Sequence, residues 1–234
     1  MKVISEEARL GLDLENGARH YRAYVGPAKN YDLCSAIQFN LLTSLGLREE
    51  HYLLDIGCGS LRGGKLFIPY LLPGRYYGIE PNQWLIEEGI ELELGKDIFK
   101  IKEPTIINDN NFSCTTFGVQ FDFFLAQSIF THASERQIKR CFSEIRKSMK
   151  ENSIIVATFS QGEENYSGEE WVYPPCVFYT IEKMKDLAGE QDLYCNIIEW
   201  PHPDEQKWML VIDNEQDIMK DALFSKINKV GRSM

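Results

Sequence analysis

The chain has 234 residues, a formal net charge of −10 and a hydrophobic fraction of 44%. This length suits one α/β domain with an added lid rather than two ordinary domains. The acidic balance, without a long basic run, argues against a nucleic-acid partner, and the longest apolar runs are far shorter than the roughly 20 residues that cross a bilayer.

The amino-terminal sequence and the cysteines also exclude several classes. The first residues carry acidic side chains and no apolar segment, so they indicate neither a secretory signal nor a transit peptide, and we expect a cytoplasmic protein. The six cysteines stand singly, with no C-x-x-C pair and no histidine at ligand spacing. This spacing predicts neither a disulfide framework nor a metal site.

Residues 1–47 are expected to form a helical cap. Within it, residues 32–47 predict an amphipathic helix that Asp32 caps, whereas residues 1–31 are more polar and predict an arm or lid. The apolar side of the helix is expected to comprise Cys34, Ile37, Leu41, Leu42 and Leu45.

Residues 48–214 are expected to form the core and residues 215–234 a tail with a frayed end. Strand-like segments alternate with helix-like ones in the first part of the core, which is typical of βαβ units around a parallel sheet. The expected strands are Tyr52–Ile56, Arg75–Glu80, Thr105–Asn108, Phe121–Ala126 and Ser153–Thr158.

The second part of the core predicts two capped helices and a reversed strand. Ser134 and Gln137 have the spacing of a capping box, and Thr180 can cap a second helix. The segments 194–200 and 207–212 then predict two strands. Only six residues join them, which suits an antiparallel pair and is too short for a helical crossover.

A glycine-rich turn follows the first expected strand, in the stretch LLDIGCGS. Gly57 and Gly59 lie in this turn, and Glu80 ends the second strand 21 residues after Gly59. In an open α/β sheet, ligands bind at the carboxyl ends of the strands. The spacing is compatible with either a dinucleotide or S-adenosylmethionine.

Asp55, two residues before the first glycine, favours S-adenosylmethionine. Like charges about 4 Å apart cost about 4 kcal/mol at an effective dielectric constant of 20, so a carboxylate here would repel a pyrophosphate. S-adenosylmethionine carries a sulfonium and an ammonium instead of a phosphate, and the same carboxylate would attract it.

The motifs resemble those of class I S-adenosylmethionine-dependent methyltransferases over about residues 32–212. LLDIGCGSLRGG is similar to motif I of that family, YYGIEPN to the acidic motif after the second strand, and FDFFLAQSIFTHAS to the motif at the fourth. The SLRGG continuation departs from the commoner G-x-G-x-G and resembles a subgroup of small bacterial methyltransferases. The resemblance implies a Rossmann-like, seven-stranded, mostly parallel sheet with the last strand antiparallel and helices on both faces.

The resemblance also implies a set of cofactor-binding residues. Those at the methionyl end would be Asp55, Gly57, Gly59, Gln127 and Ser128, with Glu80 at the ribose and Asp109 at the adenine amino group. Cys58 and Asn110, beside these residues in the sequence, are further cofactor-binding candidates. No metal is expected, because no cluster of carboxylates is visible.

Several aromatic residues and two histidines are candidates for the acceptor side. His132 follows the fourth strand and is either a general base or a structural residue at the next helix. His202, in the turn between the last two strands, either touches the acceptor or is merely solvated. The loop 160–179 predicts a lid or acceptor wall through residues such as Trp171 and Tyr173, although packing over the sheet edge explains them equally well. For Tyr21, Tyr24 and Gln38, near the amino-terminal helix, we favour packing over closure on the cofactor.

The leading hypothesis is therefore a methyltransferase that moves the methyl group of S-adenosylmethionine to an oxygen or nitrogen of a small molecule. The sequence leaves open whether the acceptor is a glycan, a lipid or an aromatic metabolite, and it leaves the oligomeric state open. Two alternatives remain, an NAD-dependent Rossmann oxidoreductase and a non-catalytic protein that binds S-adenosylmethionine or S-adenosylhomocysteine.

Overall fold

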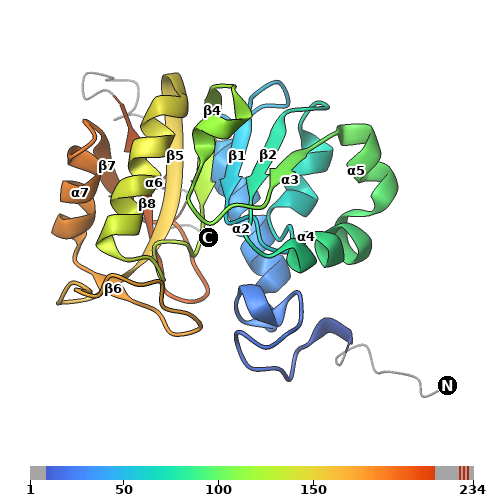
Figure 1. The fold of residues 1–234 in the computed structure, drawn as a ribbon, viewed down its shortest axis with the longest axis horizontal. Coiled ribbons are helices and arrows are strands. Elements are labelled where there is room, and N and C mark those ends of the chain that lie inside the picture. Colours follow the sequence, from blue (N-terminus) through green and yellow to red (C-terminus); the bar gives the residue numbers. More distant parts are fainter. Residues whose placement is uncertain (1–8, 214–226, 228, 230, 232–234) are drawn as a thin grey trace.

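One mixed β-sheet forms the centre of the molecule (Figure 1). The computed structural model describes residues 9–213 together with Ile227, Lys229 and Gly231. The strand order is β3-β2-β1-β4-β5-β8-β7, with β6 paired to β5 at the side. The strands are β1 (Leu53–Ile56), β2 (Tyr76–Ile79), β3 (Thr105–Ile107), β4 (Phe121–Ala126), β5 (Met149–Gln161), β6 (Phe178–Tyr179), β7 (Tyr194–Ile198) and β8 (Lys207–Ile212).

Helices cover both faces of the sheet. The α-helices are α2 (Tyr31–Ser44), α3 (Gly64–Tyr70), α4 (Gln83–Gly89), α5 (Lys96–Lys102), α6 (Glu135–Ser148) and α7 (Ile181–Gly189). The shorter turns are η1 (Ala23–Val25), η2 (Ala28–Asn30), η3 (Ile90–Leu94) and η4 (Cys114–Phe117). Because side chains alternate along a strand, Leu54 of β1 packs with α6 and α7 on one face, and Leu53 packs with α2 and α3 on the other.

The reversed final strand is confirmed. β1, β2, β3, β4 and β5 pair in parallel, whereas β8 is antiparallel to both of its neighbours, β5 and β7. The short turn between β7 and β8 makes this reversal possible. β8 lies inside the sheet, because β7 and not β8 forms the edge.

The sheet has one strand more than the predicted seven. β5 continues to Gln161, beyond the expected end at Thr158, and its last two residues pair with Phe178 and Tyr179 of β6. A two-residue strand carries no periodic signal, so the pattern of apolar residues could not predict it.

The expected apolar side of α2 is confirmed, but the expected cap is wrong. Cys34, Leu41 and the other predicted residues are buried. The helix begins at Tyr31, and no side chain caps it. The carboxylate of Asp32 instead accepts a hydrogen bond from Arg22 Nη1 (2.8 Å) and pairs with Lys65.

The capping box of α6 is confirmed. The Ser134 hydroxyl accepts a hydrogen bond from Gln137 N, and Gln137 Oε1 accepts one from Ser134 N (2.9 Å). The expected cap of α7 is also confirmed, since the Thr180 hydroxyl accepts from Lys183 N (3.1 Å).

Replacing Ser134 with alanine is expected to lower the free energy of unfolding by about 0.5–2 kcal/mol, because two backbone N–H groups of the first turn lose this reciprocal arrangement. Urea unfolding of the variant measures the change. Ser143→Ala, inside the same helix, is the control and should change stability by no more than about 0.5 kcal/mol. Equal losses in both variants would contradict the role of the cap.

The described part of the amino-terminal cap before α2 lies beyond the edge of the sheet in Figure 1 and contacts the loops at the carboxyl ends of the strands. We call residues 19–30 the strap. Arg22 of the strap donates a hydrogen bond from Nε to Glu93 Oε1 (2.9 Å). The carbonyl of Tyr21, also in the strap, accepts one from the hydroxyl of Ser60 (2.7 Å). The strap therefore covers the loop after β1.

Two expectations about the chain ends lie largely outside the described residues. Residues 1–8 and most of the expected tail, 215–234, are not described. Ile227, within the expected frayed end, is fully buried against the face that α2 and α3 cover. The proposed domain boundaries stay predictions.

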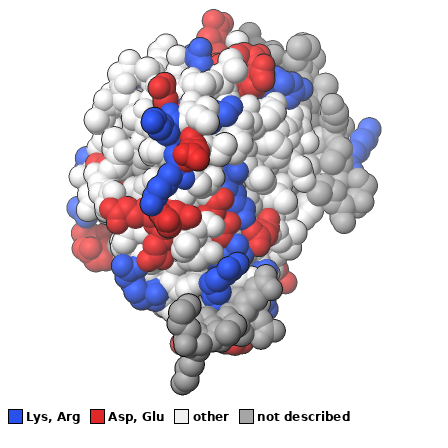
Figure 2. Space-filling view, turned by 90° about the vertical axis from the view of Figure 1, so that its right-hand side faces the viewer, with Lys and Arg blue, Asp and Glu red and all other residues white. Residues whose placement is uncertain are grey.

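Charged residues of both signs alternate on the face that carries the α5 end of the sheet. Figure 2 shows Lys and Arg interspersed with Asp and Glu there, and pairs such as Lys96–Glu91 account for part of the pattern. The described residues on this face thus form no continuous basic surface of the kind that follows a phosphate backbone. No described helix is long and apolar enough to cross a membrane.

Candidate active site

The loop between β1 and α3 turns tightly above the carboxyl end of the sheet. Gly57 (φ +71°) and Gly59 (φ +53°) both have left-handed backbones, which residues with a side chain rarely adopt. A Cβ at Gly57 would lie 2.0 Å from Ile129 Cδ1, and a Cβ at Gly59 would lie 2.8 Å from Val25 Cγ1. The two glycines thus form a cradle, which Ile129 and the strap residue Val25 cover.

Glu80 joins this loop to the end of β2. Its Oε2 accepts a hydrogen bond from Gly59 N (3.1 Å), and its Oε1 accepts from both the backbone and the side-chain amide of Asn82 (2.8 Å each). Burial raises the pKa of Glu80, and these hydrogen bonds oppose that rise. The glycine turn and the acid after the second strand therefore lie side by side in the structure.

Asp55 lies beneath the glycine loop. Its Oδ2 accepts a hydrogen bond from Tyr76 Oη (2.7 Å), a contact that the sequence did not predict. Burial raises the pKa of Asp55 to about 6, while Tyr76 and the charge of Arg62 act in the opposite direction. Since that value is below 7, the carboxyl group is mostly ionised at neutral pH.

Cys58 presents only its backbone to the loop. Its side chain is 4% exposed and packs against β2, where a Cβ on Gly78 would lie 2.9 Å from its Sγ. Burial raises the pKa of the thiol well above its usual range, so it stays protonated. Any contact of Cys58 with a ligand would come from the main chain.

Gln127, at the end of β4, is the centre of a buried polar network. Its Oε1 accepts hydrogen bonds from Arg62 Nη2 and from Gln38 Nε2 (3.0 Å). Its Nε2 lies 2.6 Å from Ser128 Oγ and 2.9 Å from His202 Nε2. Gln127 therefore links the glycine loop, α2 and the β7–β8 turn, and Gln38 makes a polar contact where we favoured packing.

Sequence reasoning missed Arg62 as a site residue. Its side chain is 8% exposed, and its Nη1 donates to the carbonyl of Val25 (2.7 Å). The available signal was the SLRGG departure from the usual glycine spacing, which places a charged residue in a loop that otherwise carries no charge.

His202 is not the solvated turn residue that was the alternative to a site role. Burial and the nearby charge of Arg62 lower its pKa to about 3, so the imidazole is neutral at pH 7. Its ring also packs on Trp208, with 5.7 Å between the ring centroids.

His132 lies beside the aromatic loop that follows β5. Its Nδ1 is 2.9 Å from the carbonyl of Val172 and 3.0 Å from that of Pro175, so this nitrogen carries the proton. Its ring lies 5.0 Å from that of Tyr173 and 5.5 Å from that of Trp171. Burial lowers the pKa of His132, although the two carbonyls oppose this.

The same loop meets the strap above the glycine cradle. Tyr173 Oη donates to the carbonyl of Tyr24, and the two rings lie 5.2 Å apart. Tyr24 also packs edge-on against Trp84 of α4, at 5.1 Å. Three segments that are distant in sequence thus close one side of the site.

Asp109 and Asn110 are placed differently from the other candidates. The carboxylate of Asp109 accepts from Asn111 N (2.8 Å) and from the backbone and hydroxyl of Ser113 (3.0 and 2.9 Å), all within its own turn. Asn110 is exposed. In this loop it is Asn108 that reaches the second motif, because its Nδ2 donates to the carbonyl of Glu80 (2.7 Å).

Comparisons with known proteins bear on the fold. No family model matches the chain, and no curated protein matches its sequence. Among solved structures, magnesium protoporphyrin IX methyltransferase from Synechocystis PCC 6803 with bound S-adenosylmethionine is 10% identical, with a TM-score of 0.62 over 88% of this chain and 90% of that one. The chain has the fold of S-adenosylmethionine-dependent methyltransferases.

Two further structures give the same result. A S-adenosylmethionine-dependent methyltransferase from Clostridium acetobutylicum ATCC 824 is 12% identical, with a TM-score of 0.56 over 78% of this chain and 91% of that one. A glycopeptide N-methyltransferase complexed with S-adenosylhomocysteine is 9% identical, with a TM-score of 0.58 over 77% and 90%. At such identities the likeness concerns the fold.

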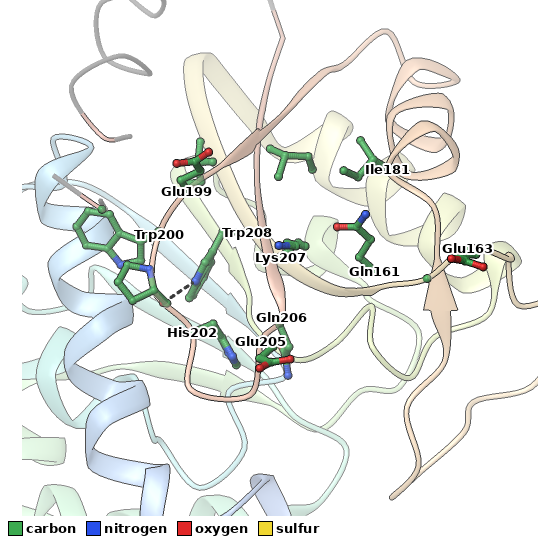
Figure 3. Close-up of a pocket in the computed structure, with 15 residues that line it drawn as sticks. Gln161, Glu163, Ile181, Glu199, Trp200, His202, Glu205, Gln206, Lys207 and Trp208 are labelled. Carbon is green, nitrogen blue, oxygen red and sulfur yellow. Dashed lines mark hydrogen bonds between the residues drawn. The ribbon is translucent and has the colours of Figure 1, made fainter. Parts of the chain in front are cut away.

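A cleft of about 840 Å³ lies beside the polar network, between β5, β7, β8 and the start of α7 (Figure 3). His202 and Gln206 line the end of the cleft that meets the network, where Gln206 Oε1 accepts from Thr158 Oγ1 (2.6 Å). Of the three expected acceptor-side residues, only His202 lines this cleft. Trp171 and Tyr173 lie with His132 instead, so the structure divides the set between two places. Among the described residues no group of three or more side chains is arranged to hold a metal ion.

Proposed function

We propose that this protein is a methyltransferase that moves the methyl group of S-adenosylmethionine to an oxygen or nitrogen of a small-molecule acceptor and releases S-adenosylhomocysteine. The observation that carries the proposal is the hydrogen bond from Gly59 N to Glu80 Oε2, which sets the glycine cradle and an acid side by side at the carboxyl ends of β1 and β2. The neighbours in fold, several of which were crystallised with this cofactor or its product, support it.

The charges of the site support this ligand over a dinucleotide. Asp55 and Glu80 are two buried acids. Arg62 is a buried base, and its positive charge lowers the pKa of Asp55. These three side chains therefore carry one more negative than positive charge. This suits S-adenosylmethionine, which has two positive groups, the sulfonium and the ammonium, and only one carboxylate. The excess negative charge would repel the two negative charges of a pyrophosphate.

The proposal assigns the cofactor to the residues that surround the glycine cradle. The backbone of residues 57–59 would approach the methionyl part closely, because neither glycine has a Cβ. Glu80 would accept from the ribose hydroxyls, and Gln127 would lie at the methionyl end. Asp109 or Asn110 would reach the adenine only from the outer side of their turn. When bound, S-adenosylmethionine supplies an activated methyl group for in-line displacement.

His132 is the proposed general base. Because Nδ1 donates to backbone carbonyls, the lone pair of the neutral ring is on Nε2, where it can accept a proton from an acceptor hydroxyl or amine. Trp171 and Tyr173 beside it would form a wall for the acceptor, and His202, which contacts Gln127, would be a second residue on the acceptor side.

Replacing Glu80 with alanine is expected to weaken S-adenosylmethionine binding by about 1–3 kcal/mol, or roughly 5- to 150-fold, because the ribose loses its charged acceptor. Titration calorimetry with S-adenosylmethionine, S-adenosylhomocysteine and NAD, on wild type and on Glu80→Ala, measures this. Glu87→Ala, on the exposed side of α4, is the control and should leave affinity unchanged.

Each result of this titration has a clear meaning. Micromolar binding of S-adenosylmethionine that depends on Glu80 supports the methyltransferase. Binding of NAD without S-adenosylmethionine would contradict the proposal and favour the oxidoreductase. Tight binding of S-adenosylhomocysteine without turnover on any acceptor would favour a non-catalytic binding protein.

A further inference from the structure

We propose that Arg62 binds the carboxylate of the methionyl group of S-adenosylmethionine and S-adenosylhomocysteine. The inference rests on the proposed function and deepens it, because it assigns to one buried side chain of the SLRGG segment the recognition of the ligand's amino-acid end. It would make Arg62 the residue that distinguishes the complete cofactor from adenosine derivatives without that end.

The guanidinium of Arg62 is buried with unused donors. It makes two hydrogen bonds, from Nη1 to the carbonyl of Val25 and from Nη2 to Gln127 Oε1. An arginine has five N–H donors, so Nε and one N–H on each terminal nitrogen are not used by any acceptor among the described residues. Both acceptors that it does contact are uncharged.

Among the described residues, Arg62 also has no counter-ion at contact distance. None of the ion pairs in the described part of the chain includes it. Arg22, which is equally buried at 8% exposed, shows the usual arrangement, because it pairs with both Glu93 and Asp32. Buried charges in proteins are normally paired, so an unpaired guanidinium in a candidate site indicates an anionic group of the ligand.

The nearby acids are engaged elsewhere. Asp55 is close enough for the charge of Arg62 to lower its pKa, although burial and the Tyr76 hydrogen bond act on it more strongly, and its carboxylate is bonded to Tyr76. Glu80 is bonded to Gly59 and Asn82. Neither acid contacts Arg62, so its guanidinium is available to form a bidentate pair with the carboxylate of a ligand.

The position of the side chain agrees with this role. Arg62 follows Leu61, whose left-handed backbone (φ +59°) continues the turn that begins at Gly57. Its guanidinium reaches Gln127 at the end of β4 and the strap at Val25, so it lies between the elements that would surround the methionyl part. Ser60, Leu61 and Arg62, which lengthen the glycine spacing, thus place a positive charge inside the candidate site.

The experiment compares two ligands that differ in the amino-acid end alone. S-adenosylhomocysteine has the carboxylate, whereas 5′-deoxy-5′-methylthioadenosine keeps the adenine, ribose and thioether without it. We expect Arg62→Gln to weaken S-adenosylhomocysteine binding about 10- to 100-fold, the range expected for loss of a charged hydrogen bond, and to change methylthioadenosine binding less than about twofold. Arg62→Lys should restore part of the loss, because it keeps the charge but not the fork.

Arg75→Gln is the control, since it removes a partly buried arginine that packs over Tyr52 just before β2, away from the proposed contact. It should leave the ratio of the two affinities as in wild type. Where Arg62→Gln does not fold, Arg62→Met, which fills a similar volume, takes its place. Calorimetry measures binding directly, so no acceptor is required.

Three results would overturn the inference. An Arg62 variant that weakens both ligands equally would assign the side chain to the packing of the loop. A variant that weakens the binding of neither ligand would indicate that Arg62 instead binds an anionic acceptor or only holds the strap in place. If wild type bound neither ligand, the proposed function itself would fail, and the inference with it.

Discussion

Replacing Arg22 with methionine is expected to lower the free energy of unfolding by about 3–5 kcal/mol, which is the usual effect of removing one partner of a buried ion pair. The side chains of Arg22 and Glu93 are 9% and 8% exposed, and Tyr21 Oη also donates to the same carboxylate oxygen (2.9 Å). Without Arg22, Lys65, at 2.9 Å, would be the one cation among the described residues that still pairs with Glu93. Denaturant unfolding followed by circular dichroism measures the change.

Two further variants identify the cause of that loss. Arg19 pairs with Glu88 at 3.6 Å, but its side chain is 63% exposed, so Arg19→Met should cost no more than about 1 kcal/mol. Adding Glu93→Gln to Arg22→Met should recover part of the stability, because it removes the carboxylate that lacks its main partner. If the Arg22 and Arg19 variants were equally stable, the buried pair would not be the source of the effect.

Replacing His132 with asparagine is expected to lower kcat by a factor of about 10² to 10⁴, the range for loss of a general base. The asparagine amide can replace Nδ1 as the donor to the carbonyls of Val172 and Pro175, but it has no group that replaces the lone pair on Nε2. The measurement is the rate of S-adenosylhomocysteine release with an accepted small-molecule acceptor.

The pH profile supplies an independent test of the same residue. Burial lowers the pKa of His132, so the ring is neutral and able to accept a proton throughout the neutral range. Activity should therefore be level near pH 7 and decrease only as the pH falls through this lowered pKa. Asparagine should abolish that acid limb and leave S-adenosylhomocysteine affinity unchanged. Full activity in His132→Asn would make the histidine a structural residue of the loop.

The parts of the fold that sequence predicted are those fixed by local patterns. The strands at 121–126 and 207–212 have the expected bounds, because an apolar run or alternation between polar turns marks each of them. The six-residue turn fixed the direction of β8, and the Ser134 box fixed the start of α6. In each case the residues that determine the element lie close to one another in the sequence.

The parts that sequence did not predict depend on distant partners. Asp32 has the right type and place for a helix cap, but the cations of Arg22 and Lys65 engage its carboxylate in the folded chain. Arg62 meets Gln127, 65 positions further along the chain, and neither local pattern indicates that contact. Asp109 is an acid near the expected position, yet its own turn uses both oxygens.

The strap has a consequence for the order in which the molecule is completed during synthesis. Its partner Glu93 follows Arg22 by 71 positions, and Tyr173 follows Tyr24 by 149. At about 5–20 residues per second, the ribosome needs roughly 7–30 s after Tyr24 to supply Tyr173. Throughout that interval the strap lacks its contact with Tyr173, so this side of the site is incomplete. The strap, although it is made before the sheet, is thus among the last segments to reach its final contacts.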